Sequence, residues 1–272
     1  MDYYVSTATD VGTRKEVNQD AVFVRRLVTP VGKMAFAVLC DGMGGLQYGE
    51  IASTEVVAGF RDWMYQRLPV LLNEGPLEDY RIRDEWGHII IEKHEYLRQL
   101  GEQYGCRMGT TAVVLLLTES RYYLLNIGDS RAYVVEQGRV HQLTEDHTAV
   151  MREIALGNLT PEQAEQSPIR HILTRCVGVG EYQPPDMSFG MPAPGALFLL
   201  CSDGFRHCIS RDELYSALYN PQWKGASELT ERCTQLIELN KQRGETDNIS
   251  VAAVYCFLNQ NAQVEETAGG AQ

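Results

Sequence analysis

Three strand patterns follow one another between residues 110 and 143, and they constrain the fold more than any other feature. They lie at 110–118 (TTAVVLLLT), 122–129 (YYLLNIGD) and 132–143 (AYVVEQGRVHQL). No helical pattern separates them, so neighbouring strands are expected to pair antiparallel. Within the third pattern, Gln137-Gly138 indicates a hairpin turn. A regular alternation of parallel strands and helices is therefore not expected.

The rest of the chain surrounds this strand run with further strands and with helices. Apolar or alternating patterns predict strands at 3–9, 21–28, 33–40, 196–203 and 248–257, and helical spacing predicts helices at about 48–66, 82–104, 212–220 and 226–243. This order favours an α+β protein with antiparallel sheets covered by helices. The polar segment 146–180 reads as a surface excursion, with a helix start at Thr160 and Gln163.

Composition limits the classes of protein to consider. The 272 residues are 44% hydrophobic and carry a net charge of −12, which suits one large domain or two small ones and disfavours a general nucleic-acid surface. The seven cysteines form no CxxC pair and are expected to be reduced and mostly buried, as in a cytoplasmic protein. No signal peptide or membrane span is expected, and the tail after Asn259 is predicted to be disordered.

Aspartates stand at the ends of five predicted strands. Asp41, Asp129 and Asp203 close strands, whereas Asp20 and Asp247 open them. One such aspartate is typically a turn or helix cap, but five carboxylates crowded together repel each other unless cations lie between them. Hard divalent cations prefer oxygen ligands. The glycines at 42, 44 and 45 suit a backbone that passes close to a cation.

Other hydrolytic chemistries fit the sequence less well. There is no GxxxxGK[ST] loop, no C-x5-R pattern at any cysteine, and the six histidines are scattered. A serine hydrolase with Ser130 as nucleophile and Asp203 and His207 as partners is a further alternative. It needs a strand-to-helix elbow, and a strand pattern follows Ser130 instead.

The motifs together resemble those of the metal-dependent protein serine/threonine phosphatases of type 2C, the PPM family, in their bacterial form. The matching stretches, in family order, are DVGTRKEVNQD (10–20), CDGMGG (40–45), GTTAVV (109–114), NIGDSRAYVV (126–135), LTEDHT (143–148), ILTRCVG (172–178), LLCSDGF (199–205) and GETDNISV (244–251). The resemblance implies a four-layer α-β-β-α sandwich, with two antiparallel sheets flanked by helix pairs. It also implies a single catalytic domain over 1–258, with 146–180 as a flap-like excursion and 259–272 as a tail.

The resemblance also implies roles for individual residues. Two Mn²⁺ or Mg²⁺ ions, with a weaker third, would hold a bridging hydroxide that attacks the phosphorus of phosphoserine or phosphothreonine. Asp41 would bridge the two metals, the Gly42 carbonyl would bind the second, and Asp203 and Asp247 would hold the first. Asp129 would join Asp203 at the third metal, and Asp20 would orient the water.

Four positions depart from the family pattern: 15, 19, 43 and 46. The basic residue expected to grip phosphate falls on Lys15, with Arg14 beside it on what is read as the opposite face of a strand, and Lys15 is favoured on spacing. Gln19 stands where glutamate is common near the second metal. Met43 and Leu46 replace histidines of some relatives, so water is expected to protonate the leaving group. A catalytically impaired, phosphoprotein-binding regulator is therefore the alternative.

Expectations about partners and neighbouring residues complete the sequence prediction. The resemblance implies phosphorylated proteins as partners, including a serine/threonine kinase and its substrates, in cytoplasmic signal transduction. We expect a monomer that binds neither nucleic acid nor a membrane. His147 is predicted to be a helix-start residue, Arg131 to pair with an acid, and Asn248 to steady the metal-site loop.

Overall fold

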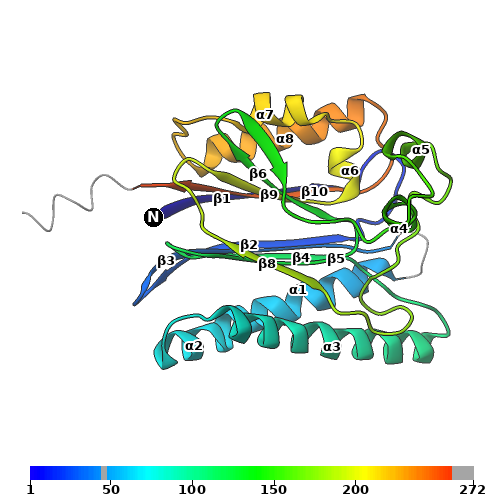
Figure 1. Cartoon of the computed structure of the whole chain (residues 1–272), viewed down its shortest axis with the longest axis horizontal. Coiled ribbons are helices and arrows are strands. Elements are labelled where there is room, and N and C mark those ends of the chain that lie inside the picture. The colour runs from blue at the N-terminus through cyan, green and yellow to red at the C-terminus, as the bar shows by residue number, and fades with distance from the viewer. Residues whose placement is uncertain (44–47, 259–272) are drawn as a thin grey trace, which may run out of the picture.

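The computed structural model describes residues 1–43 and 48–258 and has two antiparallel five-stranded sheets packed face to face between layers of helices (Figure 1). One sheet has the order β1-β10-β9-β6-β7 and the other β2-β3-β4-β5-β8. The strands are β1 (Asp2–Asp10), β2 (Asp20–Thr29), β3 (Gly32–Asp41), β4 (Ala112–Leu117), β5 (Tyr122–Ile127), β6 (Arg131–Glu136), β7 (Arg139–Gln142), β8 (Asp186–Gly190), β9 (Leu197–Cys201) and β10 (Ile249–Phe257). The predicted α+β sandwich is confirmed.

Helices cover the outer face of each sheet. Figure 1 shows α1, α2 and α3 below the second sheet and α6, α7 and α8 above the first. Their bounds are α1 (Gly49–Gln66), α2 (Leu68–Glu74), α3 (Asp79–Tyr104), α4 (Ala149–Ala155), α5 (Pro161–Glu165), α6 (Asp203–Arg206), α7 (Arg211–Leu218) and α8 (Ala226–Gln242). The sequence patterns missed α2, β8 and the single-turn α6. Within the described residues, no helix is both long and apolar enough to span a bilayer.

Strand β3 shows why the fold has four layers. Its side chains alternate: Phe36 and Val38 pack toward the helices, whereas Ala37 and Leu39 pack toward the other sheet. Both faces are buried from Met34 to Cys40, and this stretch is apolar until the strand reaches Asp41. Burial of this kind stabilises the fold by about 25 cal/mol per Å² of apolar surface. The buried stretch 34–40 therefore places the polar residue that follows it, Asp41, at one edge of the sandwich.

The remaining core predictions also hold. Trp63 and Trp86 are buried with their ring centroids 5.6 Å apart, and Trp223 is buried under the first sheet, so all three are packing residues. All seven cysteines are free thiols; four are buried and three half-buried. Segment 146–180 carries α4 and α5 at the end of the molecule where β3 finishes (Figure 1). The predicted disordered tail lies outside the described residues.

Candidate active site

The five strand-end aspartates meet at one end of the sandwich. Asp20 and Asp41 face each other directly in the β2–β3 register. Asp129 follows β5, Asp203 begins α6 just after β9, and Asp247 precedes β10. A cleft of about 670 Å³ is lined by Lys15 and by four of them: Asp41, Asp129, Asp203 and Asp247. Antiparallel pairing thus brings together carboxylates that are up to 227 residues apart (Asp20 to Asp247).

The fifth aspartate, Asp20, is held behind the cleft. Its carboxyl group is buried, and neither oxygen has a hydrogen-bond partner. Burial raises the pKa of Asp20 to about 7; the charges of Asp203 and Asp247 add to the rise, and nearby serine hydroxyls offset part of it. An unpartnered buried carboxylate is costly, so this site is built for a positive charge or a proton.

Burial and mutual repulsion destabilise the ionised form of the carboxylates that line the cleft. Burial, and then the charge of Asp20, raise the pKa of Asp41 well above its usual range. Burial and the charge of Asp203 raise the pKa of Asp129 to about 6, although Arg206 acts in the opposite direction. Divalent cations would remove both penalties, because they replace water and neutralise the charge at once. The donor set therefore fits hard divalent cations.

The backbone around Asp41 is rigidly held. The Asp41 N–H donates to Thr111 Oγ1 at 2.9 Å, and the Thr110 hydroxyl donates to the Asp41 carbonyl at 2.9 Å. Thr111 Oγ1 also contacts Ser130 Oγ at 2.7 Å. These threonines belong to the GTTAVV stretch, which carried no assigned role in the sequence. They fix the end of β3, and with it the carboxylate that faces the cleft.

Gly42 passes through a space that no side chain could share. A Cβ there would lie 2.3 Å from the Gly49 carbonyl oxygen, and the Gly42 N–H donates to the Gln19 carbonyl at 3.0 Å. This explains the glycine after Asp41 by close backbone approach. The predicted roles of Gly44, Gly45 and Leu46 fall outside the described residues. Met43 lines the cleft.

The loop 11–19 brings a basic residue to the cleft. Lys15 Nζ lies 3.0 Å from Asp247 Oδ1, and Lys15 lines the cleft. Arg14 is exposed and makes no hydrogen bond or ion pair within the described residues. The two residues lie in a turn and not in a strand, so the argument from opposite strand faces was wrong. Of the pair, the structure brings only Lys15 to the aspartates.

Asn248 anchors this loop, as expected. Its side-chain amide donates to the carbonyls of Val11 at 2.8 Å and Val17 at 3.1 Å, and its Oδ1 accepts from the Gln19 N–H at 2.9 Å. Gln19 does not line the cleft, and its side chain lies 3.3 Å from Glu50 Oε2. Asn248 therefore connects the start of β10 to the segment that carries Lys15.

Two further predicted residues have structural roles. Arg131 makes a bidentate ion pair with the buried carboxylate of Asp146, with Nε–Oδ1 at 2.8 Å and Nη2–Oδ2 at 2.6 Å. His147 lies just before α4, accepts from the Gly128 N–H at 3.1 Å and meets Asp186 at 3.0 Å. Ser130 is buried between two strands, which rules out the serine-hydrolase alternative.

A further group of cleft residues, centred on Glu245, was not predicted from sequence. The buried Glu245 accepts from the N–H groups of Thr246 at 2.7 Å and Asp247 at 2.9 Å, and it contacts His207 Nδ1 at 3.2 Å. Burial raises the pKa of Glu245, but His207 and the two amides outweigh it and lower the pKa to about 2. Glu245 therefore fixes the conformation of the Asp247 loop. In the sequence, the only indication of a role for Glu245 was its position within the GETDNISV stretch.

Comparisons with known proteins agree with this arrangement. Residues 11–242 match the family model described as Protein phosphatase 2C. The chain is 32% identical over 252 residues to Protein phosphatase PhpP of Streptococcus pneumoniae, covering 92% of this chain and 96% of that protein. The predicted family is thus confirmed.

Solved structures show the same fold. The serine/threonine phosphatase of S. agalactiae has a TM-score of 0.79 at 30% identity, over 93% of this chain and 99% of that one. The catalytic domain of the serine/threonine protein phosphatase PstP, solved in complex with two manganese ions, has a TM-score of 0.75 at 27% identity, over 94% and 99%. The strand-end aspartates thus lie on a scaffold shared with a dimanganese phosphatase, and this chain belongs to the protein phosphatase 2C family.

Proposed function

We propose that this protein hydrolyses phosphoserine and phosphothreonine in other proteins, with Mn²⁺ or Mg²⁺ bound by the strand-end aspartates. The observation that carries this proposal is the gathering of Asp41, Asp129, Asp203 and Asp247 around one cleft with Lys15 at its side. Carboxylates raised in pKa by burial and mutual repulsion need cations, and a neighbouring ammonium group suits an anionic substrate.

Each aspartate has a distinct part in this proposal. Asp41 would be shared by two cations, with the Gly42 carbonyl completing one site and Asp203 and Asp247 the other. A pair of divalent cations supplies water of lowered pKa and neutralises charge on the phosphoryl oxygens. Asp20, which lies opposite Asp41 in the β2–β3 register, would orient the attacking water. Asp129 would join Asp203 at a weaker third site, and the neutral Gln19 contributes through water or not at all.

Lys15 is proposed to bind the substrate phosphate. Its ammonium group now pairs with Asp247. A cation at Asp247 would replace that ion pair and free Lys15 for a phosphoryl oxygen at the rim of the cleft. Lysine binds as a point charge and not as a bidentate fork, so it orients the phosphate less strictly than arginine does.

The activity is tested by phosphate release from a phosphothreonine peptide and from p-nitrophenyl phosphate. We expect turnover with Mn²⁺ or Mg²⁺, none with EDTA, and none for Asp203→Asn, because each condition removes the cation or one of its ligands. A folded protein that is inactive with both metals would instead favour the phosphoprotein-binding regulator.

Single substitutions of Arg14 and Lys15 show which of the two basic residues binds the substrate phosphate. We expect Lys15→Ala to lower kcat/KM by roughly 10²-fold, because it removes one charge that stabilises the phosphoryl oxygens in the transition state. Arg14→Ala is the matched control and should stay close to the unsubstituted protein, since Arg14 is exposed and unpaired among the described residues. Steady-state kinetics on one peptide measures both. Equal losses for the two variants would contradict the assignment.

Segment 146–180 is proposed to select the substrate. It lines, with α6 and α7, an adjoining cleft of about 850 Å³ that holds four acids and four arginines: Asp129, Glu145, Asp146, Glu165, Arg131, Arg170, Arg206 and Arg211. Asp146 and Asp129 pair with Arg131 and Arg206, which leaves Arg170 and Arg211 as the arginines available to a substrate. We expect phosphopeptides with acidic flanking residues to bind better than basic ones, and Arg211→Glu to raise KM for the acidic peptide several-fold, on the order of 1 kcal/mol. Values for p-nitrophenyl phosphate should not change. Arg61→Glu on α1 is the control, and an equal effect there would refute this role.

The wider setting follows from the same proposal. Residues 1–258 would form one catalytic domain. Phosphorylated proteins would be its substrates, and a serine/threonine kinase would act in the opposite direction within cytoplasmic signal transduction. The protein would work as a monomer.

A further inference from the structure

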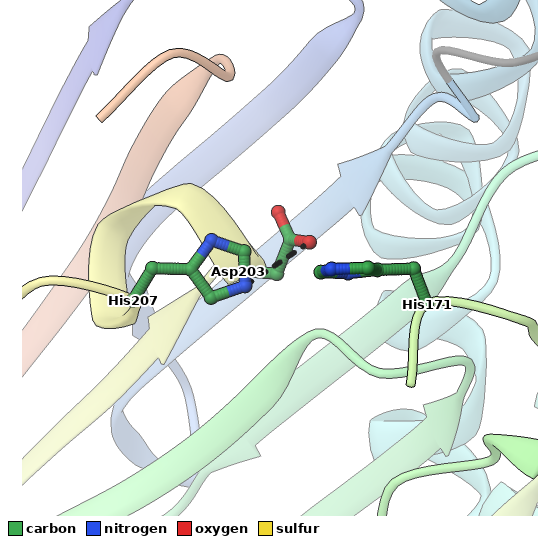
Figure 2. Close-up of side chains that lie close together, drawn as sticks. All are labelled: His171, Asp203 and His207. Carbon is green, nitrogen blue, oxygen red and sulfur yellow. Dashed lines mark ion pairs between the residues drawn. The ribbon is translucent and has the colours of Figure 1, made fainter. Parts of the chain in front are cut away.

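Two histidines lie beside Asp203, on the side of the cleft formed by segment 146–180. His171 comes from the loop after α5, and His207 follows α6 one turn beyond Asp203. One ligand atom from each of the three residues lies within 4.8 Å of the others. Figure 2 shows the two imidazole rings on either side of the Asp203 carboxylate. Segments that are more than thirty residues apart in the chain therefore converge on one point.

The His207 ring is oriented by a partner on its far side. Its Nδ1 lies 3.2 Å from the buried carboxylate of Glu245. Its other ring nitrogen, Nε2, faces Asp203 and lies 3.6 Å from Asp203 Oδ2. A cation that binds nitrogen and oxygen ligands at about 2.0–2.2 Å keeps those ligand atoms apart from each other by close to the Nε2–Oδ2 distance seen here. Carboxylate, histidine and metal in series is the arrangement that fixes the ring and raises its basicity at metal sites. The geometry of His207 is thus that of a prepared ligand.

Asp129 could also join Asp203 in binding an additional cation, but Arg206 makes Asp129 less available. Arg206 Nη2 lies 3.8 Å from Asp129 Oδ2 and 3.3 Å from the Asp129 carbonyl oxygen. A positive charge is therefore already in place at Asp129, and a second one nearby is opposed by Coulomb repulsion. A cation that joins Asp203 away from the aspartate pair finds nitrogen ligands in His171 and His207 instead.

We propose that His171, Asp203 and His207 form a mixed nitrogen–oxygen site for a transition-metal cation such as Zn²⁺, in addition to the cations held by the aspartates. Imidazole favours Zn²⁺ over Mg²⁺, whereas the aspartate cluster has only oxygen ligands. The cation would tie segment 146–180 to α6 beside the cleft. Arg170 and Arg206 lie near and oppose the bound charge, so this site is weaker than the aspartate cluster. The proposal rests on the proposed function only in sharing Asp203.

Zn²⁺ binding to the full chain, metal-depleted and then saturated with Mg²⁺, tests the site directly. Histidine side-chain nitrogen shifts are followed by NMR as Zn²⁺ is added. We expect the ring nitrogens of His171 and His207 to shift together, and those of the exposed His141 to stay constant. Mg²⁺ disfavours nitrogen ligands. The Mg²⁺-saturated protein is the reference, so any effect of Mg²⁺ at Asp203 on the His207 ring is already present before Zn²⁺ is added.

Metal content after dialysis gives a second readout. The unsubstituted chain should retain one more Zn²⁺ than His171→Ala or His207→Ala, and His141→Ala is the matched control that should lose none. Glu245→Gln should weaken Zn²⁺ binding by about 10–100-fold without abolishing it, since Glu245 orients His207 and does not touch the cation. Equal Zn²⁺ content in all the histidine variants, or unchanged His171 and His207 resonances, would overturn the proposal.

These outcomes are independent of the phosphatase assay. If the histidine site fails while phosphate release still needs Mn²⁺ or Mg²⁺, only this inference is wrong. If the histidines bind Zn²⁺ but no metal supports phosphate release, the proposed function is wrong and the site stands.

Discussion

Replacing Asp41 with asparagine should lower kcat/KM for a phosphothreonine peptide by at least about 10³-fold, which corresponds to roughly 4 kcal/mol of transition-state stabilisation. Asp41 lies at the end of β3, faces the cleft and is the carboxylate proposed to be shared by two cations. Its loss would remove a ligand from both. Isothermal titration with Mn²⁺ should show weaker binding in parallel with the loss of activity.

The same substitution should raise the thermal midpoint of the metal-free protein. Burial and the charges of Asp20 and Asp203 raise the pKa of Asp41, which means that its ionised form destabilises the folded state near neutral pH. Asparagine keeps the shape and removes the charge. The opposite signs of the two effects distinguish a lost ligand from a damaged fold.

Asp84→Asn is the matched control for Asp41→Asn. Asp84 is exposed on α3, and its side chain makes no hydrogen bond or ion pair in the described chain. Neither the activity nor the midpoint should change. An Asp41→Asn protein that melts earlier without metal and keeps its activity would contradict both parts of the expectation.

The metal-free protein should lose stability as the pH rises from about 5 to about 7. The folded-state pKa is about 7 for Asp20 and about 6 for Asp129, against an ordinary value of 3.8 for aspartate. A group whose pKa is raised by folding stabilises fully below its unfolded pKa, and that stability is lost as the pH rises through its folded pKa. For the buried Asp20 the difference corresponds to roughly 4 kcal/mol.

Carboxyl groups with lowered pKa do not cancel this trend in the same window. Asp2 and Glu245 have folded-state pKa values of about 2, so their contribution is present above the unfolded pKa and is lost only in strong acid. Between pH 5 and 7 they are ionised in both the folded and the unfolded state. The cleft carboxyl groups with raised pKa therefore determine how the free energy of unfolding changes with pH.

Urea denaturation at several pH values, with EDTA and with MnCl₂, measures this dependence. With EDTA the free energy of unfolding should fall with pH, and Asp20→Asn should flatten the slope. With Mn²⁺ the fall should disappear, because the cations hold the carboxylates in their ionised form and bind the folded state alone. A metal-free protein that gains stability over this range would show that the cleft carboxylates are not repelling one another.

Much of the fold could be predicted from the sequence because its signals are local. The apolar runs, the Gln137-Gly138 turn and the capping residues Thr160 and Gln163 set the period and the ends of elements, and each was confirmed. Short or half-exposed elements were missed: α2, α6 and β8 have too few residues to show a period. The number of sheets followed only from the family resemblance, and the strand order within each sheet depends on long-range pairing.

The site shows the same division. Which aspartates matter is visible in the sequence, because an acid that ends a buried strand stands out against apolar neighbours. Which groups surround them is not: Lys15 and not Arg14 reaches the cleft because Asn248 folds the 11–19 loop into a turn. Likewise Glu245 meets His207, and His171 meets Asp203, only once distant segments pack together.

The sequence by itself therefore determined the class of fold, the family and the identity of the carboxylates. These depend on residue type and on spacing along one strand or turn, which the chain carries locally. The tertiary structure alone decided the charge environment of each carboxylate, the basic residue at the cleft and the histidines beside Asp203. Burial and Coulomb interaction depend on distances through space, and the packing of the two sheets sets those distances.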